Sequence, residues 1–299
     1  MKFRQTPPLL VKVKPCLFGC IGIVLVSILS SFGQSSHPTI YATDGNEIIY
    51  TDEGKGTRAI VFVHGWAGNK EEWKCQLEAF SKSTRAVALD LPGFGKSGHK
   101  RSVWSIENFA TDVVSLVTTL DLDQIILVGH SMGAAVIMET AKKIPDRVIA
   151  IVPVDMFQNV EVKRSQEEID SFIRNAMSLA NDPSLEKLRP LFKRQVSDSL
   201  LIKIVNDYRG SAKVGWRESL HSHFQWMAND LLPSLSTIQV PIVCINSDRG
   251  PSNIQMARKY AKSFNVLLIR GVGHAIAVEA PDEFNSGLST VLAILDSSK

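Results

Sequence analysis

Cysteine is rare in this sequence, with four residues among 299, and we find no internal repeat or low-complexity tract. So few cysteines exclude a small domain that disulfides hold together, and the missing Gly-X-Y period excludes a collagen-like chain. Because 44% of the residues are hydrophobic, the composition also excludes an intrinsically disordered polymer. A chain of about 300 residues can bury a large single core and still carry one inserted subdomain.

Acidic residues are missing from the first 33 positions, which hold four basic ones. An apolar run from Cys16 to Leu29 follows the basic start, and the small residues Ser31 and Gly33 precede a favoured cleavage site after Gly33. This pattern predicts a signal peptide over residues 1–33 and an exported protein, periplasmic or secreted. The alternative is anchoring by an uncleaved segment, although the run falls short of the roughly 20 residues that span a bilayer. Without that segment we expect no stable membrane insertion.

The net charge of +3 belongs to this N-terminal segment. Removing residues 1–33 leaves 29 basic and 30 acidic residues, so the mature chain has a formal net charge of −1. Nucleic-acid binding needs a basic surface, and we therefore expect no nucleic-acid partner. The two remaining cysteines are Cys75 and Cys244. An exporting cell would permit a disulfide between them, but their places in the pattern favour two buried free thiols.

From residue 39 onward, short apolar runs alternate with segments of helical periodicity. Ala59–Val63 and Gln124–Val128 are apolar almost throughout, and helical segments of about 12–15 residues separate such runs. This predicts an α/β fold in which a mostly parallel central sheet has helices on both faces. The turn Asp44-Gly45-Asn46 between Thr39–Ala42 and Glu47–Thr51 predicts a hairpin. Helices are expected over Ser252–Ser263 and from Pro281.

Strand signals are missing from residues 157–233, which contain only amphipathic helical stretches. We interpret this segment as a helical cap inserted after the sixth strand. The core is then made of residues 34–156 and 234–299. We expect the cap to cover the mouth of the site and some of its aromatic residues to line an apolar substrate pocket.

The strongest chemical signal is the pentapeptide Gly129-His130-Ser131-Met132-Gly133. It stands directly after the strand QIILV and before a helix, which is the context that a G-x-S-x-G motif requires. The two glycines permit a sharp strand-to-helix turn with Ser131 at its apex. That turn directs the N-terminus of the helix at developing negative charge.

In this context the sequence resembles the α/β-hydrolase superfamily from about residue 45 to the C-terminus. Four blocks carry the resemblance, in the order that the family has them. They are His64-Gly65-Trp66-Ala67-Gly68, Asp90-Leu91-Pro92-Gly93-Phe94-Gly95-Lys96-Ser97-Gly98, the pentapeptide around Ser131, and Gly273-His274 with Glu279 and Pro281 downstream. The resemblance implies an α/β-hydrolase fold and a Ser-His-acid mechanism.

A serine hydroxyl needs a base to take its proton, and His274 is the candidate. It follows the strand VLLI in a glycine-bearing loop, where the resemblance places the catalytic histidine. His64 and His130 lie inside family motifs and are expected to hold loops. His221 and His223 alternate as H-x-H but have no acidic or cysteine partners at ligand spacing, so we predict no metal site.

The acid that orients the histidine has two candidates, because the sequence departs from the family pattern here. The loop after the strand Pro241–Ile245 reads Asn-Ser-Asp-Arg-Gly-Pro instead of the expected Gly-x-x-Asp. Asp248 is its only carboxylate and is our choice. Asp155, at the end of the preceding core strand, is the alternative, because some related enzymes carry the acid there.

Two backbone N–H groups complete the predicted machinery. The resemblance assigns the oxyanion hole to Trp66 and Met132, and the Trp66 indole is expected either to line the acyl pocket or to pack against the insertion. The glycine-rich run at 90–98 lacks both nucleotide-binding spacings, so we expect it to shape the loop beside the pocket, with Asp90 making local hydrogen bonds. Glu279 is expected to fix the loop after His274. No cofactor or metal is required.

We therefore predict a serine hydrolase that cleaves small to medium, largely apolar carboxylic esters. Ser131 would be the nucleophile, His274 the base and Asp248 the acid. The same machinery could cleave C–C bonds or amides, or transfer acyl groups to another acceptor. A non-catalytic ligand-binding homologue is the alternative from a different class. Serine at the turn argues against the related dehalogenases and epoxide hydrolases, which use aspartate there.

Overall fold

The structure is a computed structural model, and it describes residues 37–297. The predicted signal peptide over residues 1–33 lies outside the described residues. None of the helices within 37–297 combines the length and the apolar character that crossing a bilayer requires.

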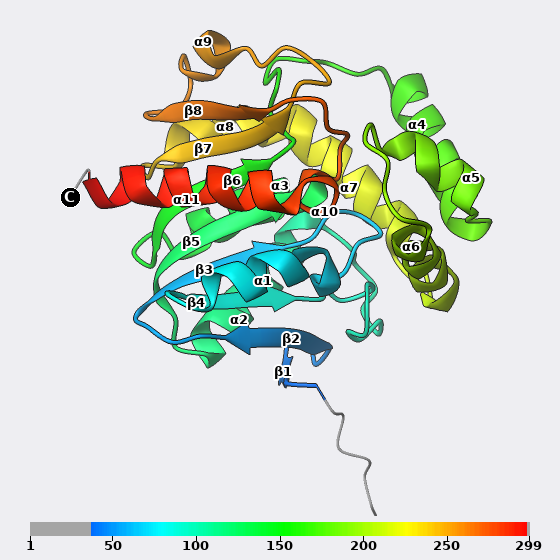
Figure 1. The fold of residues 1–299 in the computed structure, drawn as a ribbon, viewed down its shortest axis with the longest axis horizontal. Helices are drawn as coiled ribbons and strands as arrows, with labels where there is room; N and C mark the ends of the chain where they lie inside the picture. The colour runs from blue at the N-terminus through cyan, green and yellow to red at the C-terminus, as the bar shows by residue number, and fades with distance from the viewer. Residues whose placement is uncertain (1–36, 298–299) are drawn as a thin grey trace, which may run out of the picture. The chain divides into compact units, whose positions relative to one another are not determined.

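Eight strands within the described residues form one sheet, in the order β1-β2-β4-β3-β5-β6-β7-β8 (Figure 1). The first two strands form an antiparallel hairpin, β2 runs antiparallel to β4, and all other neighbours are parallel. The strands are β1 (Thr39–Tyr41), β2 (Glu47–Glu53), β3 (Arg58–Val63), β4 (Arg85–Leu89), β5 (Asp123–His130), β6 (Val148–Val154), β7 (Ile242–Ser247) and β8 (Phe264–Ile269). The central strands are buried on both faces, as their unbroken apolar sequences predict. The mostly parallel sheet and the hairpin are thus confirmed.

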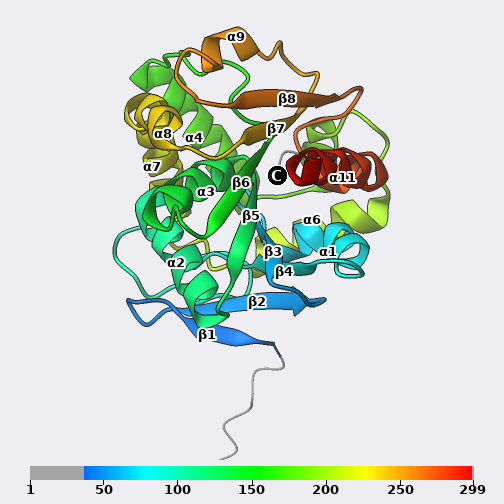
Figure 2. The same ribbon diagram turned by 90° about the vertical axis from the view of Figure 1, so that its left-hand side faces the viewer.

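Helices cover both faces of this sheet and bury two separate apolar cores. Figure 2 shows α2, α3 and α8 on one face and α1 and α11 on the other. The helices of the core are α1 (Lys74–Phe80), α2 (Ile106–Thr119), α3 (Met132–Lys143), α9 (Ile254–Ala257), α10 (Ile276–Glu279) and α11 (Pro281–Ser297), with the short 3₁₀ helix η1 (Lys70–Trp73) before α1. Packing on both faces therefore fixes the central strands that carry the loops of the site.

Between β6 and β7 the described chain forms helices and no strand. These are α4 (Gln166–Asn181), α5 (Leu185–Leu188), the 3₁₀ helix η2 (Arg189–Leu191), α6 (Asp198–Gly210), α7 (Trp216–Asn229) and α8 (Leu231–Thr237). The first of them starts with a capping box, in which Ser165 and Glu168 bond each other's backbone N–H groups. In Figure 1, α4, α5 and α6 stand beyond the ends of the strands. That the segment acts as a lid stays a prediction.

Two local expectations are wrong. The helix expected over Ser252–Ser263 is reduced to the four residues of α9, and the Arg258 guanidinium after it donates to the Phe264 carbonyl at 2.9 Å, at the start of β8. Cys75 is a free thiol as expected, but it is exposed, since it lies on the outer side of α1. Only Cys244, in β7, is a buried free thiol.

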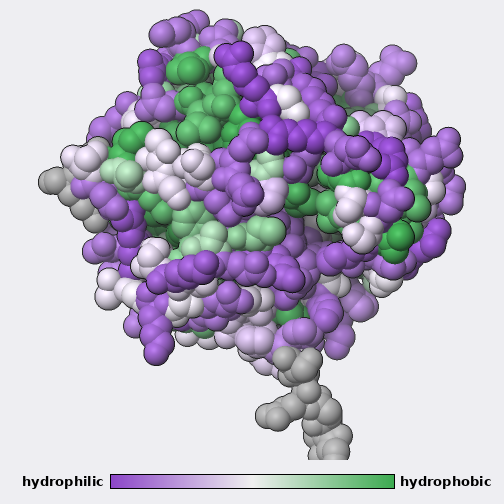
Figure 3. All heavy atoms as spheres, viewed as in Figure 1, coloured by the Kyte–Doolittle hydropathy of each residue, from purple (hydrophilic) through white to green (hydrophobic). Residues whose placement is uncertain are grey.

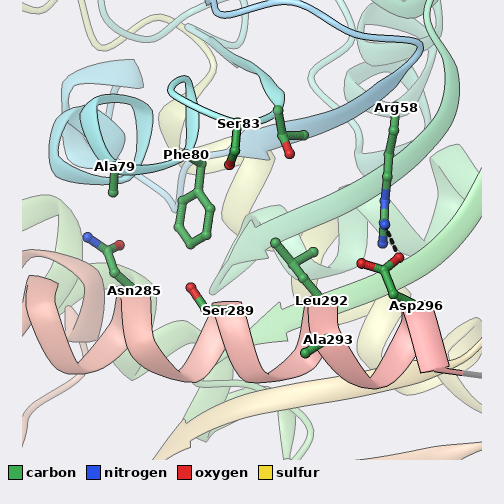
Figure 4. Close-up of a pocket in the computed structure, with 10 residues that line it drawn as sticks. Arg58, Ala79, Phe80, Ser83, Asn285, Ser289, Leu292, Ala293 and Asp296 are labelled. Carbon is green, nitrogen blue, oxygen red and sulfur yellow. Dashed lines mark hydrogen bonds and ion pairs between the residues drawn. The ribbon is translucent and has the colours of Figure 1, made fainter.

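The surface away from the strand ends has two notable features. Apolar side chains gather over the edge strand β8, where Leu268 is 46% exposed (Figure 3). A groove of about 460 Å³ lies between α1 and α11 (Figure 4). The ion pair between Arg58 and Asp296 lies at one end of this groove. It joins the end of α11 to the start of β3.

Candidate active site

The turn between β5 and α3 has the strained geometry that its two glycines permit. Ser131 has φ 52° and ψ −118°, a conformation that is rare for a residue with a side chain. A Cβ atom at Gly129 would lie 2.4 Å from the Gly133 carbonyl oxygen, and one at Gly133 would lie 2.5 Å from the Val63 carbonyl oxygen. Both positions therefore need glycine, and Ser131 is held at the apex of the turn, at the N-terminus of α3.

Three side chains form a continuous hydrogen-bonded chain at this apex. The Oγ of Ser131 lies 2.9 Å from Nε2 of His274, and Nδ1 of His274 lies 2.6 Å from Oδ2 of Asp155. Ser131 follows β5, Asp155 follows β6, and His274 follows β8. The carboxyl ends of parallel strands meet at one edge of the sheet, so three distant segments converge there.

Asp155 is the buried member of this chain, with 1% exposure. Its Oδ1 accepts hydrogen bonds from the backbone N–H and the hydroxyl of Ser247, at 2.9 and 2.7 Å. Burial alone would raise the pKa of Asp155, but the hydrogen bonds from His274 and Ser247 outweigh it and lower the pKa to about 2. The carboxylate therefore stays ionised, as a partner of an imidazolium must.

Asp248, our sequence-based choice for the acid, lies elsewhere, and this choice is wrong. Its Oδ1 accepts from Nζ of Lys193 at 3.0 Å and from the backbone N–H of Gly271 at 3.1 Å. The side chain is 39% exposed. The strand β7 ends at Ser247, which points to Asp155, and the next residue along the chain faces away from the site. The alternative acid, Asp155, is the one that the fold brings to His274.

Arg249 is a neighbour of the site that the sequence did not indicate. Its Nη2 lies 3.1 Å from Oδ2 of Asp155 and 3.3 Å from Nδ1 of His274. Burial lowers the pKa of His274, its hydrogen bond to the Asp155 carboxylate opposes this, and the charges of His130 and Arg249 lower the pKa further. The net effect is a pKa below the usual value, so the imidazole is neutral near pH 7 and can accept a proton.

Behind the three side chains, a buried ion pair joins Glu72 to His130. Burial alone would lower the pKa of His130, yet the Glu72 carboxylate raises it above its usual value. The other ring nitrogen of His130, Nε2, lies 3.0 Å from the carbonyl oxygen of His274, and Glu72 accepts the backbone N–H of Gly65 at 3.3 Å. The pair thus ties three loops of the site together. The sequence predicted a loop-holding role for His130, but nothing in it linked residue 72 to residue 130.

Two backbone N–H groups are available beside Ser131. Trp66 and Met132 both line the cavity, and neither N–H donates to another of the described residues. The Trp66 indole donates to the Trp216 carbonyl at 2.8 Å and also lines the cavity, so the two expected roles of this side chain coexist. This hydrogen bond attaches the loop at 64–68 to α7.

The remaining motif residues support neighbouring loops. Asp90 accepts from the backbone N–H groups of Lys70 and Lys96, at 2.6 and 2.9 Å. Nε2 of His64 accepts from the backbone N–H of Leu91 at 3.0 Å, and Glu279 accepts from that of Gly273 at 2.8 Å. These contacts agree with the structural roles expected for them.

The side chains of the site open into a cavity of about 660 Å³ under the inserted helices. Its walls are largely apolar. They include Met156 and Phe157 from the loop after β6, Ile169, Phe172 and Leu179 from α4, and Leu220, Phe224 and Met227 from α7. Across residues 37–297, no group of three His, Cys, Asp or Glu side chains is placed to hold a metal ion. The inserted helices thus supply much of the wall that a substrate would touch.

The sequence profile described as the alpha/beta hydrolase family matches residues 60–286, which include all three hydrogen-bonded side chains. The chain belongs to this family. It is accordingly a hydrolase, and the eight-stranded sheet is the fold that its relatives share.

Relatives of this hydrolase cover most of its length. It is 25% identical over 267 residues to an (E)-2-((N-methylformamido)methylene)succinate hydrolase from Acinetobacter baylyi, which spans 85% of this chain and 97% of that protein. A thermophilic esterase from Thermogutta terrifontis, solved with malate bound, matches with a TM-score of 0.71 and 22% identity over 87% of this chain and 99% of its own. An esterase from Exiguobacterium antarcticum matches with a TM-score of 0.73 and 18% identity over 86% and 99%.

Proposed function

We propose that this hydrolase cleaves carboxylic esters through Ser131, His274 and Asp155. The observation that carries the proposal is the hydrogen-bonded chain from the Ser131 hydroxyl through both ring nitrogens of His274 to a buried carboxylate. Such a chain gives a serine hydroxyl a base and gives that base a fixed orientation.

In the first half of the reaction, the Oγ of Ser131 attacks the acyl carbon of the ester while Nε2 of His274 takes the hydroxyl proton. The carbonyl oxygen becomes an oxyanion, and the N–H groups of Trp66 and Met132 stabilise it. Collapse of the tetrahedral intermediate breaks the bond to the leaving oxygen, which receives the proton from His274. The acyl group is then bound to Ser131 as an ester.

In the second half, a water molecule takes the place of the alcohol. His274 removes a proton from this water as it attacks the acyl carbon, and the same N–H groups stabilise the second oxyanion. The Ser131–acyl bond breaks, and His274 returns the proton to the Ser131 oxygen. Asp155 stays ionised throughout, because its depressed pKa keeps the proton on the imidazole.

The size of the cavity suits an ester with a small to medium acyl or alcohol group. A volume of about 660 Å³ is in the usual range for small-molecule sites, and its walls are largely apolar. The esterases among the structural neighbours share the fold, and that likeness by itself assigns no substrate.

The test is ester hydrolysis by the purified protein and by its Ser131→Ala variant. With a series of p-nitrophenyl esters, we expect kcat/KM to fall at least about 10³-fold in the variant, since the nucleophile is lost. A fluorophosphonate probe should label the wild type and not the variant. Ser199→Ala, which removes an exposed hydroxyl on α6, is the control and should behave as wild type. Equal rates and no labelling in all three proteins would refute the proposal.

A further inference from the structure

One polar side chain in the cavity lacks a partner. His223, on α7, is 7% exposed and lines the cavity, and its Nδ1 is buried without a hydrogen bond to any residue in 37–297. A buried polar atom without a partner costs folding free energy, and such an atom in a native structure calls for an explanation. Because Nδ1 itself is buried, Nε2 is the ring nitrogen through which His223 can contact a ligand in the cavity. Burial lowers the pKa of His223 to about 4, and the charges of His274 and Arg164 act in the same direction. The ring is therefore neutral and can donate one N–H.

The charged groups that line the cavity are unbalanced. They are the guanidinium groups of Arg164 and Arg249 and the carboxylate of Asp155. Asp155 already accepts from His274, Ser247 and Arg249, so it offers little to a substrate cation.

Arg164 precedes α4, and its exposed side chain makes no hydrogen bond with another residue in the described part of the chain. The charge of Arg164 acts on the carboxylate of Glu168, which accepts the backbone N–H of Ser165 and does not line the cavity. A guanidinium that faces a cavity binds carboxylates through paired N–H···O bonds.

We propose that the substrate carries a carboxylate at a distance from the scissile ester, and that Arg164 and His223 bind it. The apolar walls then hold the carbon chain between the two groups, so the substrate class is the half-ester of a dicarboxylic acid. This inference rests on the proposed ester hydrolysis and names the substrate of the same site.

The test compares two esters of equal chain length. Mono-p-nitrophenyl glutarate and p-nitrophenyl pentanoate differ in one end group, a carboxylate in place of a methyl. We expect kcat/KM for the glutarate ester to be at least about tenfold higher in the wild type, a difference that one charge-assisted contact can supply. Added salt should reduce this ratio, because Arg164 is exposed.

Two variants examine the residues. Arg164→Gln should bring the ratio of the two kcat/KM values to within about threefold, and His223→Leu should do the same. Arg174→Gln removes an exposed arginine of α4 that does not line the cavity, and it should keep the wild-type ratio. Because His223 is buried, its replacement can unfold the protein. The ratio of the two kcat/KM values in Arg164→Gln, a change at an exposed residue, therefore decides the test.

The outcomes separate this inference from the proposed function. Ser131-dependent cleavage of both esters at similar rates would overturn the carboxylate site and leave the serine hydrolase intact. A glutarate preference that survives in Arg164→Gln would overturn it as well. If neither ester is cleaved and a fluorophosphonate fails to label Ser131, the proposed function fails and the inference fails with it.

Discussion

The loops after β6 and β7 each begin with an aspartate, but the two carboxylates have opposite surroundings. Asp155 is buried and accepts hydrogen bonds from His274 and Ser247. Asp248 is 39% exposed and pairs with Lys193, a residue of the inserted segment. The difference shows that the packing of the strand ends, and not the spacing of a motif, determines which carboxylate meets His274.

The β7 loop still contributes to the site, through the residues on either side of Asp248. The Ser247 hydroxyl and the Arg249 guanidinium both donate to Asp155. The loop thus supplies donors that keep the carboxylate of β6 ionised and oriented. Residues that position a catalytic group often matter nearly as much as the group itself.

The largest expected effect is a loss of kcat on replacing Asp155, with the same replacement of Asp248 as the comparison. Asp155→Asn keeps the shape of the side chain but offers His274 an uncharged partner, so we expect kcat to fall by about 10³–10⁴, as it does when other Ser-His-Asp triads lose their acid. Asp248→Asn should leave kcat within about twofold of wild type. Steady-state hydrolysis of a p-nitrophenyl ester measures both. A loss of kcat confined to Asp248→Asn would reverse our assignment.

Much of this site could be predicted from local chemistry. Gly129 and Gly133 predict the turn, because a side chain at either position would collide with the backbone. His274 follows a strand, in the loop where the resemblance places the catalytic histidine. The acid could not be decided in this way. Asp155 and Asp248 both follow strands, and only the packing of the β6, β7 and β8 loops determines which carboxylate meets the imidazole.

The inserted helices were predicted as helices, but their inward-facing residues were not. The sequence indicates His223 only as part of an H-x-H pattern, because helical periodicity does not say which residues of α7 face the cavity. Arg164 lies in the loop before α4 and has no local signal at all. Contacts between segments that are distant in sequence carry that information.

The same contrast between a buried and an exposed carboxylate recurs at Glu72 and Glu78. Glu72→Gln removes the negative charge that stabilises buried His130, and we expect the free energy of unfolding to fall by about 2 kcal/mol. Glu78→Gln breaks the i,i+4 pair with Lys74, in which both side chains are more than 60% exposed, so its effect should stay below about 1 kcal/mol. Urea unfolding followed by circular dichroism measures both. Equal losses would mean that the buried pair does not stabilise the loops behind the site.

The smallest expected effect concerns the pH dependence of the wild type and of Arg249→Gln. The rate constant kcat/KM rises as His274 loses its proton, so its acid limb reports the pKa of this imidazole, which we expect below the usual value of 6.5. Removing the positive charge of Arg249 stabilises the imidazolium. The pKa then rises and the acid limb moves to higher pH, by less than roughly one pH unit because the guanidinium is half-exposed and screened.

Arg270→Gln removes an exposed arginine from the end of β8 that does not line the cavity, and its profile should match the wild type. If the acid limb of Arg249→Gln stayed in place or moved to lower pH, Arg249 would not hold the histidine neutral, and the loop after β7 would act on the site through Ser247 alone.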